Sequence, residues 1–246
     1  MVLPDINNFT VIESVYGKFV VNRHCTFQAE ALIKTGRPHI DGELEILLAI
    51  VDTLPDPAFV VDAGANIGLI SIPIAARLLP RGGAVLAFEV QRMVHYALAA
   101  GAVLNDLENL FAYQQGLGAQ DGEMFISRVD YASEQDHGAF SLLHQGEARP
   151  EHIRIVALDS LGLPKLDLLK IDVEGMELDV LAGAHATIAR FRPWCWIEDW
   201  KVGADPIKAV FGGLDYDFFQ MDDLNLLCAP RDKLATSGLV FKRAET

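Results

Sequence analysis

A short apolar run that ends in an acid and a glycine-containing turn constrains the fold of this chain more than any other feature. Residues 59–62 form the run, with Asp62 at its end, and residues 63–68 contain Gly64 and Gly68. Glycine lets the backbone turn sharply and approach a ligand closely, because it has no Cβ. A helix that starts after the turn presents free N–H groups at its N-terminus. The pattern predicts a strand, a tight turn and a helix that together hold a nucleotide-like cofactor in an α/β sheet.

The spacing of the glycines separates two classes of cofactor. A dinucleotide fingerprint requires Gly-x-Gly-x-x-Gly, whereas Asn66 and Leu69 occupy its second and third glycine positions here. Asp62 comes before the turn, where a carboxylate would lie beside a cationic group of the ligand. S-adenosylmethionine carries two such groups, an ammonium and a sulfonium. The turn therefore favours S-adenosylmethionine over a dinucleotide.

A second apolar run, residues 84–88, ends in Glu89, which follows Gly68 by 21 residues. A carboxylate at the end of the second strand of a βαβ unit can accept hydrogen bonds from both ribose hydroxyls. NAD and S-adenosylmethionine share that ribose, so Glu89 alone does not separate them. A single acid at a strand end is more often a solvated loop residue. Two acids that each end an apolar strand around a glycine turn indicate a cofactor site.

A third motif follows the apolar run 166–171 and precedes a predicted helix over residues 176–189. With the three motifs in this order, the chain resembles the FkbM-type S-adenosylmethionine-dependent methyltransferases. The glycine turn is common to many methyltransferases, and its combination with the motif 170–175 is more specific. The resemblance spans roughly residues 40–200 and rests on the segments 61–68, 88–89 and 169–177, together with Val180, Leu181 and Gly183.

The resemblance implies a Rossmann-like class I methyltransferase fold, in which a doubly wound, mostly parallel seven-stranded sheet ends with an antiparallel strand. It implies S-adenosyl-L-methionine as the cofactor and O-methylation of a hydroxyl on a small molecule or glycan by in-line methyl transfer. The residues expected to bind the cofactor are Asp62, Gly64, Ala65, Asn66, Gly68, Glu89 and Asp172.

Two residues depart from the family pattern. Val90 stands where members often have proline after the acid, which changes only the stiffness of the loop because Glu89 is present. Met176 stands where many members have histidine. The resemblance therefore does not carry over a histidine as the proton acceptor.

Asp172 and Glu174 are the candidate catalytic residues, because both follow the fourth strand, where the methyl group of the cofactor is expected to point. In an extended segment two residues rise about 6.6 Å and their side chains share a face, which suits acceptor binding or a shared divalent cation. Alternatively, Asp172 contacts only the methionine end of the cofactor and Glu174 caps the following helix. Lys170 lies inside an apolar strand, which favours a structural salt bridge over catalysis. No histidine joins the acids at a ligand spacing, so no metal site is expected.

Three further residues are candidates for contact with the acceptor substrate. Glu198 and Asp199 end the predicted strand 194–198 at the same edge of the sheet, where they either bind the acceptor or solvate a loop. His144 lies in the polar stretch 116–150, a predicted loop insertion that also contains His137 and Ser141. Insertions at this edge commonly shape substrate pockets, although surface residues without a role are the more frequent case.

The chain of 246 residues is expected to form a single methyltransferase domain, with a core over residues 56–246 and an N-terminal addition over residues 1–55. The addition reads as a hairpin over 9–21 and a helix near 42–54. It could cover the cofactor or cap a sheet edge, and the cap is favoured. Further strands are expected near 111–115, 216–221, 225–228 and 238–241, and further helices near 67–79 and 91–105.

The formal net charge of −14 argues against a nucleic-acid substrate, because phosphate binding requires clustered lysine and arginine. The three cysteines are odd in number and widely spaced, which suggests neither disulfides nor a zinc site and makes a reducing cytoplasm the default. No signal peptide is visible, and the apolar region 58–79 reads as strand plus helix instead of a membrane span. The oligomeric state is left open.

Two other functions remain open at this point. A nucleotide-dependent oxidoreductase is disfavoured by the absence of the third glycine of the dinucleotide fingerprint. A protein that binds S-adenosylmethionine or a partner without turnover retains the same cofactor residues. Methylation of nitrogen instead of oxygen also fits the sequence.

Overall fold

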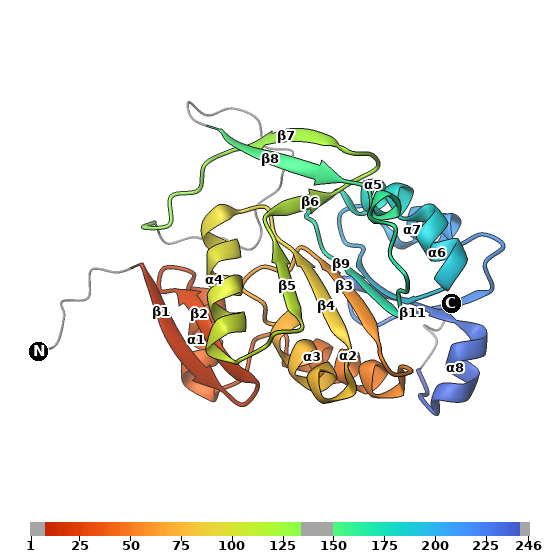
Figure 1. The fold of residues 1–246 in the computed structure, drawn as a ribbon, viewed down its shortest axis with the longest axis horizontal. Helices are drawn as coiled ribbons and strands as arrows, with labels where there is room; N and C mark the ends of the chain where they lie inside the picture. The colour runs from red at the N-terminus through yellow and green to blue at the C-terminus, as the bar shows by residue number, and fades with distance from the viewer. Residues whose placement is uncertain (1–7, 134–149, 242–246) are drawn as a thin grey trace, which may run out of the picture.

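A seven-stranded sheet forms the centre of the computed structural model, which describes residues 8–133 and 150–241 (Figure 1). In spatial order its strands are β11 (Tyr216–Gln220), β12 (Asn225–Pro230), β10 (Trp194–Glu198), β9 (Leu168–Ile171), β3 (Phe59–Ala63), β4 (Ala84–Phe88) and β5 (Leu110–Tyr113). Strand β12 runs antiparallel to β10 and β11, and the other neighbouring pairs for which registers are defined are parallel. The predicted doubly wound α/β fold with an antiparallel last strand is confirmed.

Helices cover both faces of this sheet. One face carries α2 (Asp41–Thr53), α3 (Ser71–Leu78) and α4 (Arg92–Leu104), and the other carries α5 (Glu177–Gly183), α6 (His185–Phe191) and α7 (Ala204–Val210). The consecutive residues Val60 and Val61 belong to the two different apolar cores, because side chains alternate along a strand. A strand that is buried on both faces needs apolar residues at every position, which explains the continuous apolar runs in the sequence.

Several elements differ from the prediction at their ends. Helix α3 begins at Ser71 and not near residue 67, because Gly68 has a φ of +88°, outside the range of a right-handed helix. The helix expected over 176–189 is divided at Ala184 into α5 and α6. The strand expected near 238–241 is absent from the described chain. Helix α8 (Arg231–Ser237) lies before it and ends at Gly238, which adopts the left-handed conformation.

The N-terminal addition contains a hairpin and two helices. Strands β1 (Phe9–Ser14) and β2 (Gly17–Asn22) form a separate antiparallel sheet, followed by α1 (Thr26–Thr35), which was not predicted, and by α2. The hairpin packs on α4 through β2, and α2 packs on α3. The edge strands of the large sheet are β5 and β11, and the hairpin pairs with neither. The hairpin therefore does not extend the large sheet, and the expectation that the addition caps a sheet edge stays a prediction.

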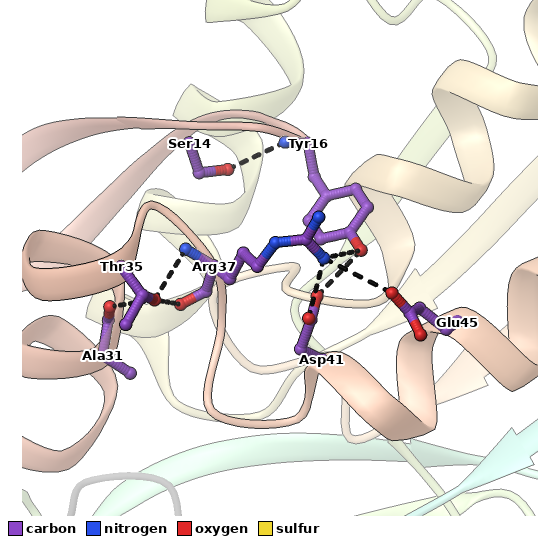
Figure 2. Close-up of polar contacts among 7 residues, drawn as sticks. All are labelled: Ser14, Tyr16, Ala31, Thr35, Arg37, Asp41 and Glu45. Atoms are coloured by element: carbon purple, nitrogen blue, oxygen red, sulfur yellow. Dashed lines mark hydrogen bonds and ion pairs between the residues drawn. The ribbon is translucent and has the colours of Figure 1, made fainter.

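A polar network fixes the first turn of α2, as Figure 2 shows. Asp41 accepts a hydrogen bond from the Tyr16 hydroxyl of the hairpin turn at 2.8 Å and one from the Arg37 guanidinium at 2.8 Å. The same guanidinium lies 3.4 Å from the carboxylate of Glu45, one turn further along the helix. These contacts connect the hairpin, the loop between α1 and α2, and α2 itself.

A second, three-stranded sheet follows the third parallel strand of the core. Its order is β6 (Gln115–Leu117), β8 (Glu151–Val156) and β7 (Gly122–Ile126). The stretch 116–150 was predicted as a loop insertion, but β7 lies inside it and pairs antiparallel with β8. The strand expected near 111–115 is divided between β5 and β6. Because β7 and β8 bury only one face, with Ile126, Ile153 and Ile155 inside, they lack the continuous apolar runs of the core strands.

Candidate active site

The turn after β3 brings two strand ends into contact. Gly64 has a φ of +79°, and a Cβ at this position would lie 1.7 Å from the backbone oxygen of Asp172 at the end of β9. Gly68 has a φ of +88°, and its Cβ would lie 2.7 Å from Leu98 of α4. Gly64 therefore requires glycine for both conformation and space, and Gly68 requires it for conformation. The result is a backbone wall at the carboxyl ends of β3 and β9.

A pocket opens along this wall and encloses about 570 Å³ of space that is partly open to solvent. Five of the predicted site residues line it: Gly64, Asn66, Glu89, Asp172 and Glu174. The other lining residues were not predicted: Phe88, Val90, Gln91, Gln115, Gly116, Leu117 and Val173. Three of these come from β6, directly after the third parallel strand. In the sequence, these three residues are marked only by their position directly after the third strand of the alternating strands and helices.

Glu89 lies at the end of β4 and faces the glycine turn. One carboxylate oxygen accepts a hydrogen bond from the backbone N–H of Asn66 at 3.0 Å, and the other accepts one from the N–H of Gln91 at 2.7 Å. Burial raises the pKa of Glu89 to about 7, against the lowering effect of these two hydrogen bonds. Each oxygen retains a lone pair, so the carboxylate can accept further hydrogen bonds from hydroxyl groups in the pocket.

Asp62 lies behind the pocket wall and does not line the pocket. It is buried, with 1% of its surface exposed. Its carboxylate accepts a hydrogen bond from the Ser71 hydroxyl at 2.5 Å and lies 3.4 Å from the ammonium of Lys170. Ala65 and Gly68 were also expected to bind the cofactor. They belong to the glycine turn after β3 and, like Asp62, do not line the pocket. These three residues support the shape of the wall.

Lys170 holds the ends of β3 and β9 together. Its ammonium donates hydrogen bonds to the backbone oxygen of Gly64 at 3.0 Å and to the carboxylate of Asp172 at 3.2 Å. Burial lowers the pKa of Lys170, but the charges of Asp172 and Asp62 more than offset this and the net pKa is raised. Lys170 is therefore a buried cation with structural partners.

Four carboxylates gather at the carboxyl ends of β9 and β10: Asp172, Glu174, Glu177 and Glu198. Glu174 has a φ of +61° and forms an ion pair with Lys201. Burial is the main cause that raises the pKa of Glu174, and Lys201 opposes it. Among the residues that the structure describes, no group of three or more such side chains is arranged to hold a metal ion.

Glu177, which the sequence analysis did not single out, holds the turn between β9 and α5. It is fully buried, and one of its carboxylate oxygens accepts hydrogen bonds from the N–H groups of Val173 at 3.2 Å and Gly175 at 2.9 Å. Its other oxygen is buried and has no hydrogen-bond partner within the described chain. Glu177 thus stabilises the turn before α5, and within the described chain no side-chain cap hydrogen bond forms at the start of that helix.

Glu198 ends β10, and its charge interacts with those of Asp172, Glu174 and Glu177. One of its oxygens is buried and lacks a hydrogen-bond partner in the described part of the chain. Burial, followed by the negative charges of Asp172 and Glu174, raises the pKa of Glu198 to about 8. A carboxylate with such a pKa is a better proton acceptor near neutral pH than an ordinary glutamate.

Asp199 is also buried, so it is not a solvated loop residue. Both of its carboxylate oxygens lie 3.1 Å from the amide nitrogen of Gln220, which donates to them from the end of β11. His144, His137 and Ser141 lie outside the described residues. Within the described ranges, no helix is long and apolar enough to cross a membrane.

The strand order and the pocket at the carboxyl ends of the parallel strands define a Rossmann-like class I methyltransferase fold. Residues 62–224 match the Methyltransferase FkbM domain family. The chain belongs to this family. A crystal structure of Methyltransferase FkbM from Methylobacillus flagellatus KT is similar in fold, with a TM-score of 0.52 and 17% identity over 85% of this chain and 55% of that one.

Two curated relatives are methyltransferases by name. Methyltransferase 1 of Beauveria bassiana is 29% identical over 154 residues, which cover 54% of this chain and 61% of that protein. Methyltransferase sdnD of Sordaria araneosa is 30% identical over 164 residues, which cover 54% of this chain and 62% of that protein. The chain thus matches less than two thirds of the length of either relative.

Proposed function

We propose that this chain transfers the methyl group of S-adenosylmethionine to a hydroxyl oxygen of a small molecule or glycan. The observation that carries the cofactor assignment is the Glu89 carboxylate, which faces the glycine turn across the pocket. It is held by two backbone N–H groups and still offers acceptor positions. A ribose with two neighbouring hydroxyls matches this acceptor.

The residues of the pocket fit the two ends of this cofactor. Glu89 would hold the ribose, and the apolar side chains of Val90 and Leu117 would flank the adenine. Gly64, Asn66 and Asp172 would hold the methionine end. The bound cofactor supplies an electrophilic methyl group on a sulfonium sulfur.

The main contribution of the chain is to position the acceptor for in-line attack, which can supply roughly 7–11 kcal/mol of the barrier. We assign Asp172 and Glu174 to acceptor binding at the reaction centre. Asp172 is paired with Lys170 and Glu174 with Lys201, so both carboxylates have a fixed direction. Glu198, whose pKa is raised to about 8, accepts the proton of the attacking hydroxyl.

The acidic character of the chain supports a neutral or cationic acceptor and speaks against nucleic acid. A cytoplasmic location is part of the proposal, because Cys25, Cys195 and Cys228 are all buried and form no disulfide with one another.

Calorimetric titration with S-adenosylmethionine, S-adenosylhomocysteine and NAD in parallel tests the cofactor. The proposal expects micromolar binding of the first two ligands and none of NAD. Binding of NAD alone would favour a nucleotide-dependent oxidoreductase, and binding of no ligand would refute the assignment. Formation of S-adenosylhomocysteine with a panel of hydroxylated acceptors then tests turnover, and binding without turnover on any acceptor would favour the non-catalytic alternative.

A further inference from the structure

One of the three tryptophans of this chain is exposed, and it stands at the edge of the sheet where the pocket opens. Trp194 and Trp196 lie inside β10 and are each 1% exposed, whereas Trp200 follows that strand and is 55% exposed. Tryptophan has a large apolar ring, so its exposure to water forgoes much of the free energy that burial would provide. A single exposed aromatic side chain is common on protein surfaces, so its surroundings decide whether it has a role.

The turn that carries Trp200 is fixed at both ends. The backbone N–H of Asp199 donates to the backbone oxygen of Leu224 at 2.7 Å, and the N–H of Gly203 donates to the backbone oxygen of Asp199 at 2.6 Å. The Asp199 carboxylate is held in addition by the Gln220 amide at 3.1 Å. Since the backbone of this turn is already ordered, a ligand that stacks on the indole does not have to order it on binding.

Lys201 places the indole beside the pocket. Its ammonium lies 4.9 Å from the centre of the Trp200 ring and forms an ion pair with the carboxylate of Glu174. Glu174 lines the pocket. The side chains of Lys201 and Glu174 are 23% and 15% exposed, so both contacts of the ammonium are partly shielded from water. One ammonium therefore connects the exposed indole to a residue of the pocket wall.

The strand order places this indole at the end of the pocket that is opposite to Glu89. Along the carboxyl edge of the sheet, Trp200 follows β10, Asp172 and Glu174 follow β9, the glycine turn follows β3, and Glu89 follows β4. The two candidate catalytic carboxylates thus lie between the indole and the proposed ribose site. A ligand that contacts Trp200 approaches these carboxylates from the side away from the cofactor, as an acceptor must for in-line transfer.

We propose that Trp200 is a platform on which a ring of the acceptor stacks, so that the enzyme selects hydroxyl groups carried on a ring. This inference rests on the proposed function and narrows its acceptor. An indole face packs well against a flat ring with an apolar face, and the neighbouring carboxylates accept hydrogen bonds from its hydroxyl groups. A pyranose and an aromatic ring share this chemistry. An open-chain alcohol reaches the carboxylates but gains nothing from the indole.

Three groups of acceptors with neighbouring hydroxyls isolate this contact. Methyl β-D-glucopyranoside and related pyranosides carry them on a sugar ring, catechols carry them on an aromatic ring, and glycerol and related polyols carry them on an open chain. Initial rates of S-adenosylhomocysteine formation are measured for the wild type, Trp200→Ala, Trp200→Phe and the control Phe111→Ala. Phe111 is a 48% exposed aromatic residue of β5, which three strands separate from β10. Thermal unfolding and the Kd of S-adenosylhomocysteine verify that the variants are folded.

We expect Trp200→Ala to raise the KM of the ring acceptors about tenfold and to leave the Kd of S-adenosylhomocysteine and the KM of the open-chain polyols within about twofold. Trp200→Phe keeps an aromatic face and should stay within about threefold of the wild type. Phe111→Ala should not change these values. The ring group that the wild type methylates identifies the source as sugar or aromatic compound.

Two outcomes would overturn the inference while the proposed function stands. One is an equal or absent effect of Trp200→Ala on ring and open-chain acceptors, and the other is a wild type that methylates open-chain polyols alone. A wild type that methylates no member of the three groups would overturn both proposals.

Trp200 itself provides a second measurement in the wild type if Trp200→Ala does not fold. Because the other two tryptophans are buried, acrylamide quenches mainly the fluorescence of Trp200. With S-adenosylhomocysteine bound, a ring acceptor should lower this quenching about twofold by covering the indole, whereas glycerol should leave it unchanged. Quenching that no methylated ring acceptor reduces would contradict the stacking.

Discussion

The carboxylates around the pocket differ in the groups that compensate their charge. Asp172 has an ammonium partner in Lys170, Glu174 has one in Lys201, and Glu89 accepts from two backbone N–H groups. Glu198 has one buried oxygen without a hydrogen-bond partner in the described chain. Proton transfer and ligand binding are therefore expected at different residues of the same strand edge.

The roles of Glu89 and Glu174 can be separated by substitution. Glu89→Ala should weaken S-adenosylmethionine and S-adenosylhomocysteine at least about tenfold, because the ribose loses its acceptor. Glu174→Ala should leave both Kd values within about twofold and lower turnover. Calorimetry and initial rates measure the two effects. An unchanged Kd in Glu89→Ala would refute the ribose assignment.

The pH dependence of turnover tests Glu198. Only the ionised form accepts a proton, so kcat should rise with pH through about 8. Glu198→Gln should lower kcat by about 10²-fold or more and remove this rise, with the Kd of S-adenosylhomocysteine unchanged. Glu108→Gln, at an exposed position, serves as the control. A rise that persists in Glu198→Gln would exclude Glu198 as the proton acceptor.

At the scale of single residues, the sequence predicts which residues line the site better than it predicts the contacts that they make. The strand-end acids Glu89, Asp172 and Glu174 line the pocket because the end of a parallel strand is a position that the sequence pattern defines. The burial of Asp62 behind the wall depends on Ser71 and Lys170, which are distant in the sequence or outside the motif. Hydrogen bonds from the turn to Glu177 are equally invisible to pattern analysis.

At the scale of elements, the glycine turn sets the distance between β3 and β9. Gly64→Ala should abolish cofactor binding and lower the free energy of unfolding by more than about 1 kcal/mol, because its Cβ collides with the backbone of Asp172 and its φ is positive. Gly122→Ala is the control, since a Cβ there meets no atom within 4 Å. Calorimetry and urea unfolding measure the two effects. Wild-type binding in Gly64→Ala would show that the wall can move.

Elements that are buried in the sheet were predicted more accurately than elements that bury a single face. Strands β4 and β10 match the predicted bounds, because both are apolar runs buried in the sheet. Helix α1, strand β7 and helix α7 were missed, because each is short or buries a single face. Their structure depends on packing against distant segments, which local periodicity does not record.

At the scale of the whole molecule, acidic groups make stability depend on pH. The pKa values of Glu43, Glu89 and Glu198 are raised to about 7, 7 and 8 in the folded state. The unfolded chain loses these protons near pH 4.5, so folding stability falls as the pH rises from there to about 8. The net charge of −14 at neutral pH adds repulsion in the same direction.

The melting temperature of the free protein should therefore be lower at about pH 8 than at about pH 6. Scanning calorimetry in matched ionic strength measures the difference. Glu89→Gln should reduce it, because the amide stays neutral in both states. A melting temperature that rises over this interval would contradict the burial of these carboxyl groups.

The family match begins at residue 62, and α2 ends at Thr53, so the matched segment omits this helix. A shortened protein that starts at the glycine turn would uncover the sheet face that Leu44, Leu47 and Ile50 now protect.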